Sequence, residues 1–178
     1  MEMNFKDKKV LITGASKGLG KAAAISFEGE GARLVLAARS DDKLAELKSS
    51  FTDPGKHLSF NLDLLDSGNI EKMSNDISKK WGNLDIILHC IGGSLGVNDT
   101  LVEWDEFTKC LKGNIGIASE INKHFVPGMK EQGYGNIIHV GSIVGSEAEA
   151  SVPYNSAKAA LSGYVRSLGN ELLEQGII

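Results

Sequence analysis

The stretch Thr13-Gly14-Ala15-Ser16-Lys17-Gly18-Leu19-Gly20 decides the fold, because it joins a short apolar segment directly to an amphipathic one. A strand that turns through glycines into a helix offers an anion free backbone N–H groups and the positive end of the helix dipole. Gly14 permits a tight turn, Gly18 a close approach of the ligand, and Gly20 close packing of helix on strand. Turns also collect glycine for steric reasons alone. The strand-turn-helix context nevertheless favours a dinucleotide diphosphate as the ligand.

The rest of the chain repeats this alternation of short apolar and longer amphipathic segments. The predicted strands are 9–13, 33–38, 57–62, 84–90 and 135–140. The predicted helices are 18–30, 41–50, 67–81, 102–129 and 152–175. Strands that are apolar on both faces, each followed by a helix, indicate a parallel sheet covered on both sides. We therefore expect an α/β fold, a Rossmann-like doubly wound parallel sheet, in a single domain over 1–178.

The composition argues against several classes of function. The chain has 178 residues and a net charge of -4, without a basic cluster, which disfavours nucleic acid and anionic membrane as partners. Cys90 and Cys110 are too few for a disulfide framework and lack neighbours at zinc-ligand spacing, so we expect free thiols and no metal. The N-terminal segment has no apolar signal core, and no apolar run approaches the roughly 20 residues of a membrane helix. These features predict a cytoplasmic protein.

The end of the second predicted strand bears on the choice between NAD and NADP. NAD sites carry an acidic residue about 20 positions beyond the turn, whereas an arginine accommodates the 2′-phosphate of NADP. Here the strand ends in Ala37-Ala38-Arg39-Ser40, with no carboxylate before Asp41. Arg39 can hold a phosphate with two hydrogen bonds, and Lys17 adds a second positive charge. Either cation alone is as readily an ordinary surface residue, but together with the missing acid they favour NADP(H).

Tyr154 and Lys158 are four residues apart near the start of the last predicted helix, and therefore share one face. A phenol has a reference pKa of about 10, and a fixed ammonium beside it lowers that pKa and suits it to proton transfer. Ser142 follows the fifth predicted strand, where ligands of open α/β sheets bind, and its hydroxyl can hold a substrate oxygen. In isolation each of these residues is more often an ordinary surface or turn residue. Their position in the fold carries the argument.

In order and spacing, these motifs resemble those of the short-chain dehydrogenase/reductases over the whole chain. Thr13 to Gly20 resembles the TGxxxGxG turn of that family, Tyr154 to Lys158 its YxxxK motif, and Ser142 its catalytic serine. The resemblance implies hydride transfer between NADP(H) and a small carbonyl or alcohol substrate. Tyr154 would be the acid/base, and Lys158 would lower its pKa and hold the nicotinamide ribose. The catalytic residues implied are Asn114, which helps to carry a proton-relay water, Ser142, Tyr154 and Lys158. The cofactor-binding residues implied are Gly14, Ser16, Lys17, Gly18, Leu19, Gly20, Arg39, Ser40, Asp63, Leu64, Gly92, Tyr154 and Lys158.

Two departures from the family pattern are visible. After the fourth strand the family has Asn-Asn-Ala-Gly, whereas His89-Cys90-Ile91-Gly92 keeps only the glycine. Adjacent strand residues point to opposite faces, which favours structural roles for His89 and Cys90 over a reactive pair. The sequence also stops at Ile178, before the last strands and the substrate-covering segment of the family. The resemblance therefore implies a domain that is incomplete at its C-terminus.

Other functions remain open at the level of sequence. One alternative is a truncated or degenerate relative that binds the nucleotide without turnover. An epimerase or dehydratase of the extended branch would carry a TGxxGxxG turn, which this chain does not match. A 3-oxoacyl reductase is a generic example of a ketone reductase, and the motifs do not select it. The family forms dimers and tetramers through helices like 102–129 and 152–175, so we expect a homodimer or homotetramer. An apolar stripe in the first of these helices fits either core or interface; it comprises Trp104, Phe107, Leu111, Ile115 and Ile121.

Overall fold

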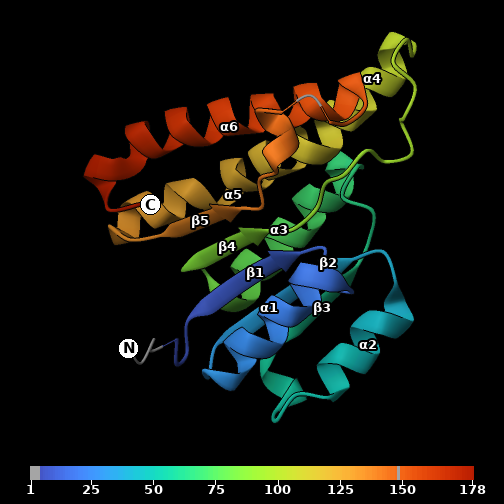
Figure 1. Ribbon diagram of the computed structural model, residues 1–178. Coiled ribbons are helices and arrows are strands. Elements are labelled where there is room, and N and C mark those ends of the chain that lie inside the picture. Colours follow the sequence, from blue (N-terminus) through green and yellow to red (C-terminus); the bar gives the residue numbers. More distant parts are fainter. Residues whose placement is uncertain (1–4, 148) are drawn as a thin grey trace.

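Parallel strands form the centre of the computed structural model, which describes residues 5–147 and 149–178 (Figure 1). The strands are β1 (Lys9–Thr13), β2 (Arg33–Ala38), β3 (Leu58–Asn61), β4 (Ile86–His89) and β5 (Asn136–His139). Their order in the sheet is β3-β2-β1-β4-β5, and every neighbouring pair is parallel. The chain reverses its direction of travel across the sheet between β1 and β4. This switch point opens a crevice beyond the carboxyl ends of the strands, where doubly wound sheets bind ligands.

Helices cover both faces of the sheet (Figure 1). The α-helices are α1 (Gly18–Gly29), α2 (Asp41–Ser49), α3 (Ser67–Trp81), α4 (Trp104–Leu111), α5 (Ile117–Gln132) and α6 (Val152–Leu172). Three short 3₁₀ turns occur at Pro54–Lys56 (η1), Ile143–Gly145 (η3) and Leu173–Gln175 (η4), and a π-helical turn (η2) spans Lys112–Gly116. Within the described residues, no helix is long and apolar enough to cross a membrane. Residues 1–4, part of the predicted N-terminal segment, and Ala148 lie outside the described residues.

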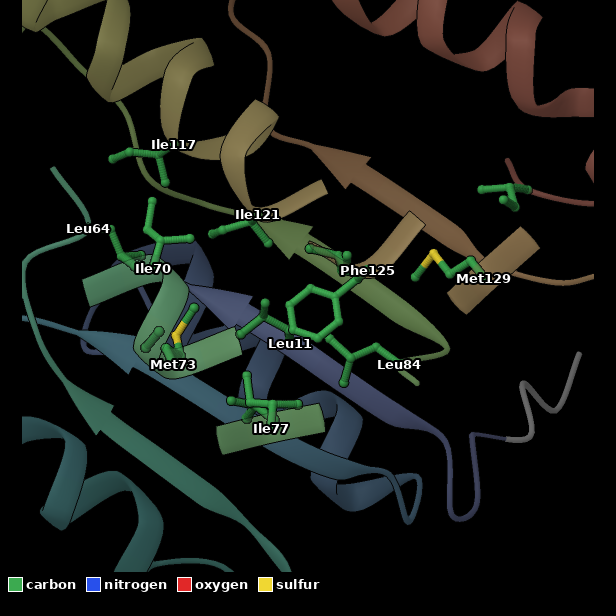
Figure 2. Close-up of a cluster of buried hydrophobic side chains, with 14 of the residues drawn as sticks. Leu11, Leu64, Ile70, Met73, Ile77, Leu84, Ile117, Ile121, Phe125 and Met129 are labelled. Carbon is green, nitrogen blue, oxygen red and sulfur yellow. The ribbon is translucent and has the colours of Figure 1, made fainter. Parts of the chain in front are cut away.

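Two hydrophobic cores hold these layers together, one on each face of the sheet. In β1, Leu11 faces the core formed with α3 and α5, while Val10 and Ile12 face the core formed with α1 and α2. Figure 2 shows the first core, in which side chains of α3 and α5 gather around the sheet. Fully burying an aliphatic or aromatic side chain of this size contributes roughly 1.5–3 kcal/mol. The double coverage explains why the strand segments are apolar at successive positions rather than at alternate ones.

The predicted elements are all present, and the main difference lies in the helix expected over 102–129. It begins at Trp104, contains the π turn, and continues through Pro127 to Gln132. The π turn coincides with Gly113, where the side chain of Leu95 occupies the space that a Cβ atom would need. A glycine at this point lets the loop after β4 pack directly on the helix backbone. The Rossmann-like doubly wound fold itself is confirmed.

Candidate active site

A cleft of about 520 Å³ lies at the switch point, beyond the carboxyl ends of the strands. Its walls come from the turn between β1 and α1, from the segments after β2 and β3, and from the residues after β4. The predicted cofactor residues that line it are Gly14, Ser16, Lys17, Gly18, Leu19, Gly20, Arg39, Ser40, Asp63, Leu64 and Gly92. Segments that are far apart in the sequence therefore meet in one cavity of a size that suits an organic ligand.

The glycine turn is shaped as a backbone cradle at one wall of this cleft. Gly14 and Gly18 have φ values of +69° and +54°, which side chains adopt reluctantly. A Cβ atom on Gly20 would overlap the carbonyl oxygen of Gly14, so only glycine lets α1 begin this close to the turn. No side chain caps the first turn of α1 in the described part of the chain. Its amides therefore remain available to an anion, as a bound diphosphate requires.

Positively charged side chains line this cleft at the glycine turn, at the end of β2 and at the start of α2. Arg39 and Lys17 both line the cleft and both are exposed. Lys43, on the first turn of α2, lines it as well, and the sequence reasoning missed this residue. Its spacing of four residues from Arg39, just inside a predicted helix, was the signal that could have identified it. Three cationic side chains therefore line the cleft, which suits a ligand that carries phosphate groups.

Gly92 marks the place where the cleft reaches the predicted catalytic residues. A Cβ atom there would lie 2.7 Å from Oδ1 of Asn114 and 3.3 Å from Nζ of Lys158. Asn114 lies in the π turn, a feature often found at functional sites. Its amide holds Gly93 from both sides, donating to the carbonyl at 2.8 Å and accepting from the N–H at 3.1 Å. The loop after β4 is thereby fixed against the helix that carries Asn114.

Lys158 is almost completely buried, although it carries a charged group. Its ammonium donates a hydrogen bond of 2.9 Å to the carbonyl oxygen of Val140, at the end of β5. Burial lowers the pKa of Lys158, and the nearby Cys110 thiol opposes that shift. Nζ of Lys158 lies 6.0 Å from the ring centroid of the half-buried Tyr154, one turn earlier on α6. Burying a lysine is costly, so its placement beside a phenol indicates a functional site.

Ser142 lies at the same end of the sheet, exposed at the start of the η3 turn. Its hydroxyl oxygen accepts a hydrogen bond of 3.4 Å from the N–H of Val144. The η3 turn packs on α6, since a Cβ atom on Gly145 would lie 3.0 Å from the carbonyl carbon of Lys158. The structure thus brings the turn that carries Ser142 to the helix that carries Tyr154 and Lys158.

The side chains of His89 and Cys90 lie on opposite sides, as expected of neighbours in a strand. Cys90 is half-buried and lines the cleft, whereas His89 faces the interior, where Nε2 is 3.0 Å from Oδ1 of Asn122. Cys110 is buried, and burial raises the pKa of both thiols. Across residues 5–147 and 149–178, no group of three or more His, Cys, Asp or Glu side chains could hold a metal ion.

Known proteins resemble this chain in both sequence and structure. The sequence model of the short chain dehydrogenases matches residues 8–178. The chain is 32% identical over 170 residues to an NADPH-dependent pterin aldehyde reductase of Arabidopsis thaliana, covering 94% of this chain and 70% of that protein. It is 30% identical over 176 residues to 3-oxoacyl-[acyl-carrier-protein] reductase FabG of Salmonella typhimurium, covering 98% and 71%. The structure of L-sorbose reductase from Gluconobacter frateurii, complexed with NADPH and L-sorbose, matches with a TM-score of 0.90 at 30% identity, covering 99% and 68%.

Proposed function

This chain belongs to the short chain dehydrogenase family of oxidoreductases, and we propose that it interconverts a carbonyl and an alcohol using NADP(H). The observation that carries the proposal is the junction at Gly92, which joins the cleft to Asn114 and Lys158. A dinucleotide that rests on the glycine turn and follows the cleft to this junction ends beside the candidate acid/base. The nicotinamide cofactor supplies the hydride when it is bound, and the protein supplies position and proton traffic.

The choice of NADP(H) rests on the three cationic side chains that line the cleft. We propose that Arg39 binds the 2′-phosphate with two hydrogen bonds, and that Lys17 and Lys43 add positive charge. Asp63 and Leu64 line the same end of the cleft and would contact the adenine. Two of the similar proteins support this choice, since one is NADPH-dependent and the other was solved with NADPH.

The proton step is assigned to Tyr154. In the direction of reduction, the carbonyl carbon accepts the hydride while the phenol donates its proton to the carbonyl oxygen. Ser142 donates a hydrogen bond to that oxygen and keeps it beside the phenol. Lys158, fixed by Val140, keeps a positive charge beside Tyr154, which stabilises the phenolate that remains after the proton is donated. Asn114 fixes the loop that closes the inner end of the cleft.

We further propose a homodimer or homotetramer in the cytoplasm, formed through α4, α5 and α6. The apolar stripe predicted for the helix over 102–129 lies partly in the core and partly on the surface. Ile121 is buried in the sheet core, whereas Trp104 is 68% exposed and stacks on Phe107 at 5.4 Å. The exposed part of the stripe is therefore free to pack against a second copy. Light scattering coupled to size exclusion tests this, and a monomer at all concentrations would contradict it.

NADPH fluorescence tests the proposed activity directly. Titration should show enhanced fluorescence on binding, and addition of a carbonyl substrate should then oxidise the cofactor. The similar proteins suggest a panel of an aldehyde, a 3-oxoacyl thioester and a keto sugar. Binding without oxidation across the panel would favour the second candidate, a nucleotide-binding module without turnover. Failure to bind NADPH would exclude both.

A further inference from the structure

Two histidines that have no part in the proposed reaction stack against each other at the active-site end of the sheet. His89 ends β4 and His139 ends β5, and the register of the two strands places them side by side. Their rings are 4.7 Å apart between centroids, with an interplanar angle of 21°. His89 is only 5% exposed. Such a pair is brought together by sheet pairing rather than by proximity in the sequence.

The hydrogen bonds around His89 define its proton arrangement. Nδ2 of Asn122 donates to the hydroxyl of Tyr164 at 3.0 Å, and with the amide placed in this way its oxygen faces His89. Nε2 of His89 therefore carries the hydrogen and donates it to Asn122, and Nδ1 is left as an acceptor. Burial lowers the pKa of His89 to about 3 and that of His139 to about 4, with His139 and Lys158 respectively adding to these shifts. Both rings are therefore neutral near pH 7.

Three ring nitrogens of this pair are buried without a hydrogen-bond partner among the described residues. They are Nδ1 of His89 and both nitrogens of His139. A neutral histidine has one donor nitrogen and one acceptor nitrogen, so the pair offers a free acceptor on His89 and a free donor on His139. Buried polar groups in native proteins are almost always satisfied, if not by protein then by ordered water.

A small cavity adjoins both rings. It has a volume of about 10 Å³ for the centre of a water molecule, which is room for about one. Thr13, Asn114 and Val140 also line it. The Thr13 hydroxyl accepts a hydrogen bond of 3.2 Å from the N–H of Cys90, so its own hydrogen can be donated into the cavity. The cavity thus combines the size of one water with the two to four polar partners that a buried water needs.

We propose that this cavity binds one ordered water molecule, which donates a hydrogen bond to Nδ1 of His89 and accepts one from the ring N–H of His139. The hydroxyl of Thr13 is a third partner. The water accounts for two of the three unsatisfied nitrogens and leaves one acceptor on His139.

The water site is lined by Val140, the residue to which Lys158 is hydrogen-bonded. The N–H of Val140 donates to the carbonyl of His89 at 3.1 Å, and the carbonyl of Val140 accepts from Lys158 at 2.9 Å. Val140 and Asn114 both line the cavity. Resting on the proposed function, the two histidines are therefore positioning residues, because they and their water set the end of β5 to which the lysine is fixed.

Histidine-selective ¹⁵N NMR of the whole chain with NADPH tests the water site without requiring turnover. We expect His89 as the Nε2–H tautomer, His139 as one neutral tautomer, and nuclear Overhauser contacts from their ring protons to a long-lived water. Rapid exchange between tautomers of His139, or the absence of the water contact, would overturn the proposal. This readout is independent of catalysis. The water site can therefore be absent in an active oxidoreductase, and it can be present in a protein without turnover.

Paired variants test the positioning role. His139→Phe keeps a planar ring but removes both ring nitrogens, so it should abolish the water contact. Misplacing a catalytic group by about 1 Å can cost about a hundredfold in rate, and a smaller displacement of Lys158 should cost less. We therefore expect kcat to fall roughly tenfold, with an unchanged KM for NADPH. His139→Asn restores a donor and an acceptor and should recover most of kcat. His57→Phe is the control, because His57 is also buried and accepts a hydrogen bond of 3.1 Å from the N–H of Leu34, near the amino end of β2. It should lower thermal stability without changing kcat. Equal kcat in the Phe and Asn variants of His139 would overturn the positioning role.

Discussion

The ammonium of Lys158 on α6 lies 2.9 Å from the carbonyl oxygen of Val140 and donates a hydrogen bond to it. This contact joins the helix that carries the YxxxK motif to the strand end that precedes Ser142. The lysine is thereby fixed by two elements, although it belongs to a residue type that is usually mobile and solvated. Fixed charge at a buried position is what the proposed chemistry requires.

Lys158→Met should separate the catalytic charge of the lysine from its bulk. Methionine fills a similar volume and removes the cost of burying a charge, which offsets the loss of the hydrogen bond to the Val140 carbonyl. We expect the melting temperature to be retained while kcat falls about a hundredfold or more, in the range that positioned acid-base groups contribute. Steady-state kinetics and thermal unfolding on one preparation measure both. Turnover above half of the original rate would show that the charge at this position is dispensable.

Arg39→Ala should change cofactor choice more than overall binding. Hydrogen bonds to charged groups are each worth about 1.5–3 kcal/mol, so loss of Arg39 should weaken NADPH by roughly tenfold or more and leave NADH nearly unaffected. Fluorescence titration with both dinucleotides measures the ratio. Arg166→Ala, at an exposed position on α6, is the matched control and should change neither affinity. Equal losses for NADPH and NADH in the Arg39 variant would remove the argument for a 2′-phosphate contact.

Gly92→Ala should disturb the junction between the cleft and the catalytic residues. The added Cβ would lie 2.7 Å from Oδ1 of Asn114, closer than carbon and oxygen tolerate. Asn114 or the loop must then move, and the φ of +155° at Gly92 is one that side chains rarely adopt, so we expect turnover to fall together with a loss of stability. Gly163→Ala on α6 is the control, since its Cβ would meet nothing within 4 Å and should stabilise the helix by up to about 1 kcal/mol. Unchanged kinetics in the Gly92 variant would separate this glycine from the reaction.

Stability should fall in mild acid because His89 and His139 are buried as neutral rings. Their pKa values of about 3 and about 4 lie below the unfolded value of 6.5, so the unfolded chain binds protons first as pH falls. The stability that the neutral rings contribute is complete above pH 6.5 and is lost from there towards pH 4 and 3. Each histidine contributes a slope of up to about 1.4 kcal/mol per pH unit. Urea unfolding at pH 7.5 and pH 5 measures the loss, and the double variant His89→Asn/His139→Asn should reduce it. An identical loss in that variant would assign the acid sensitivity to other groups.

The sequence was sufficient to predict much of this architecture, for identifiable reasons. The bounds of β1, β2 and α3 agree with the prediction, because strands with apolar interiors and a strongly amphipathic helix are readily delimited in the sequence. The glycine turn could be recognised because it lies directly between a predicted strand and a predicted helix. The stacked histidines could not be predicted, since only the register of β4 and β5 places His139 beside His89. The π turn was likewise hidden, because nothing in the local sequence shows that Leu95, from the loop after β4, packs against Gly113 there.

Turnover of the Tyr154→Phe variant tests the central claim most directly. Phenylalanine keeps the ring that packs near Lys158 and removes only the hydroxyl that would transfer the proton. NADPH oxidation and NADPH affinity should be measured side by side for the original chain and the variant with the same carbonyl substrate. We expect kcat to fall by about 10²–10⁴-fold, the usual contribution of a positioned acid or base, with an almost unchanged dissociation constant for NADPH. Oxidation at the original rate would show that Tyr154 is not the acid/base of this protein.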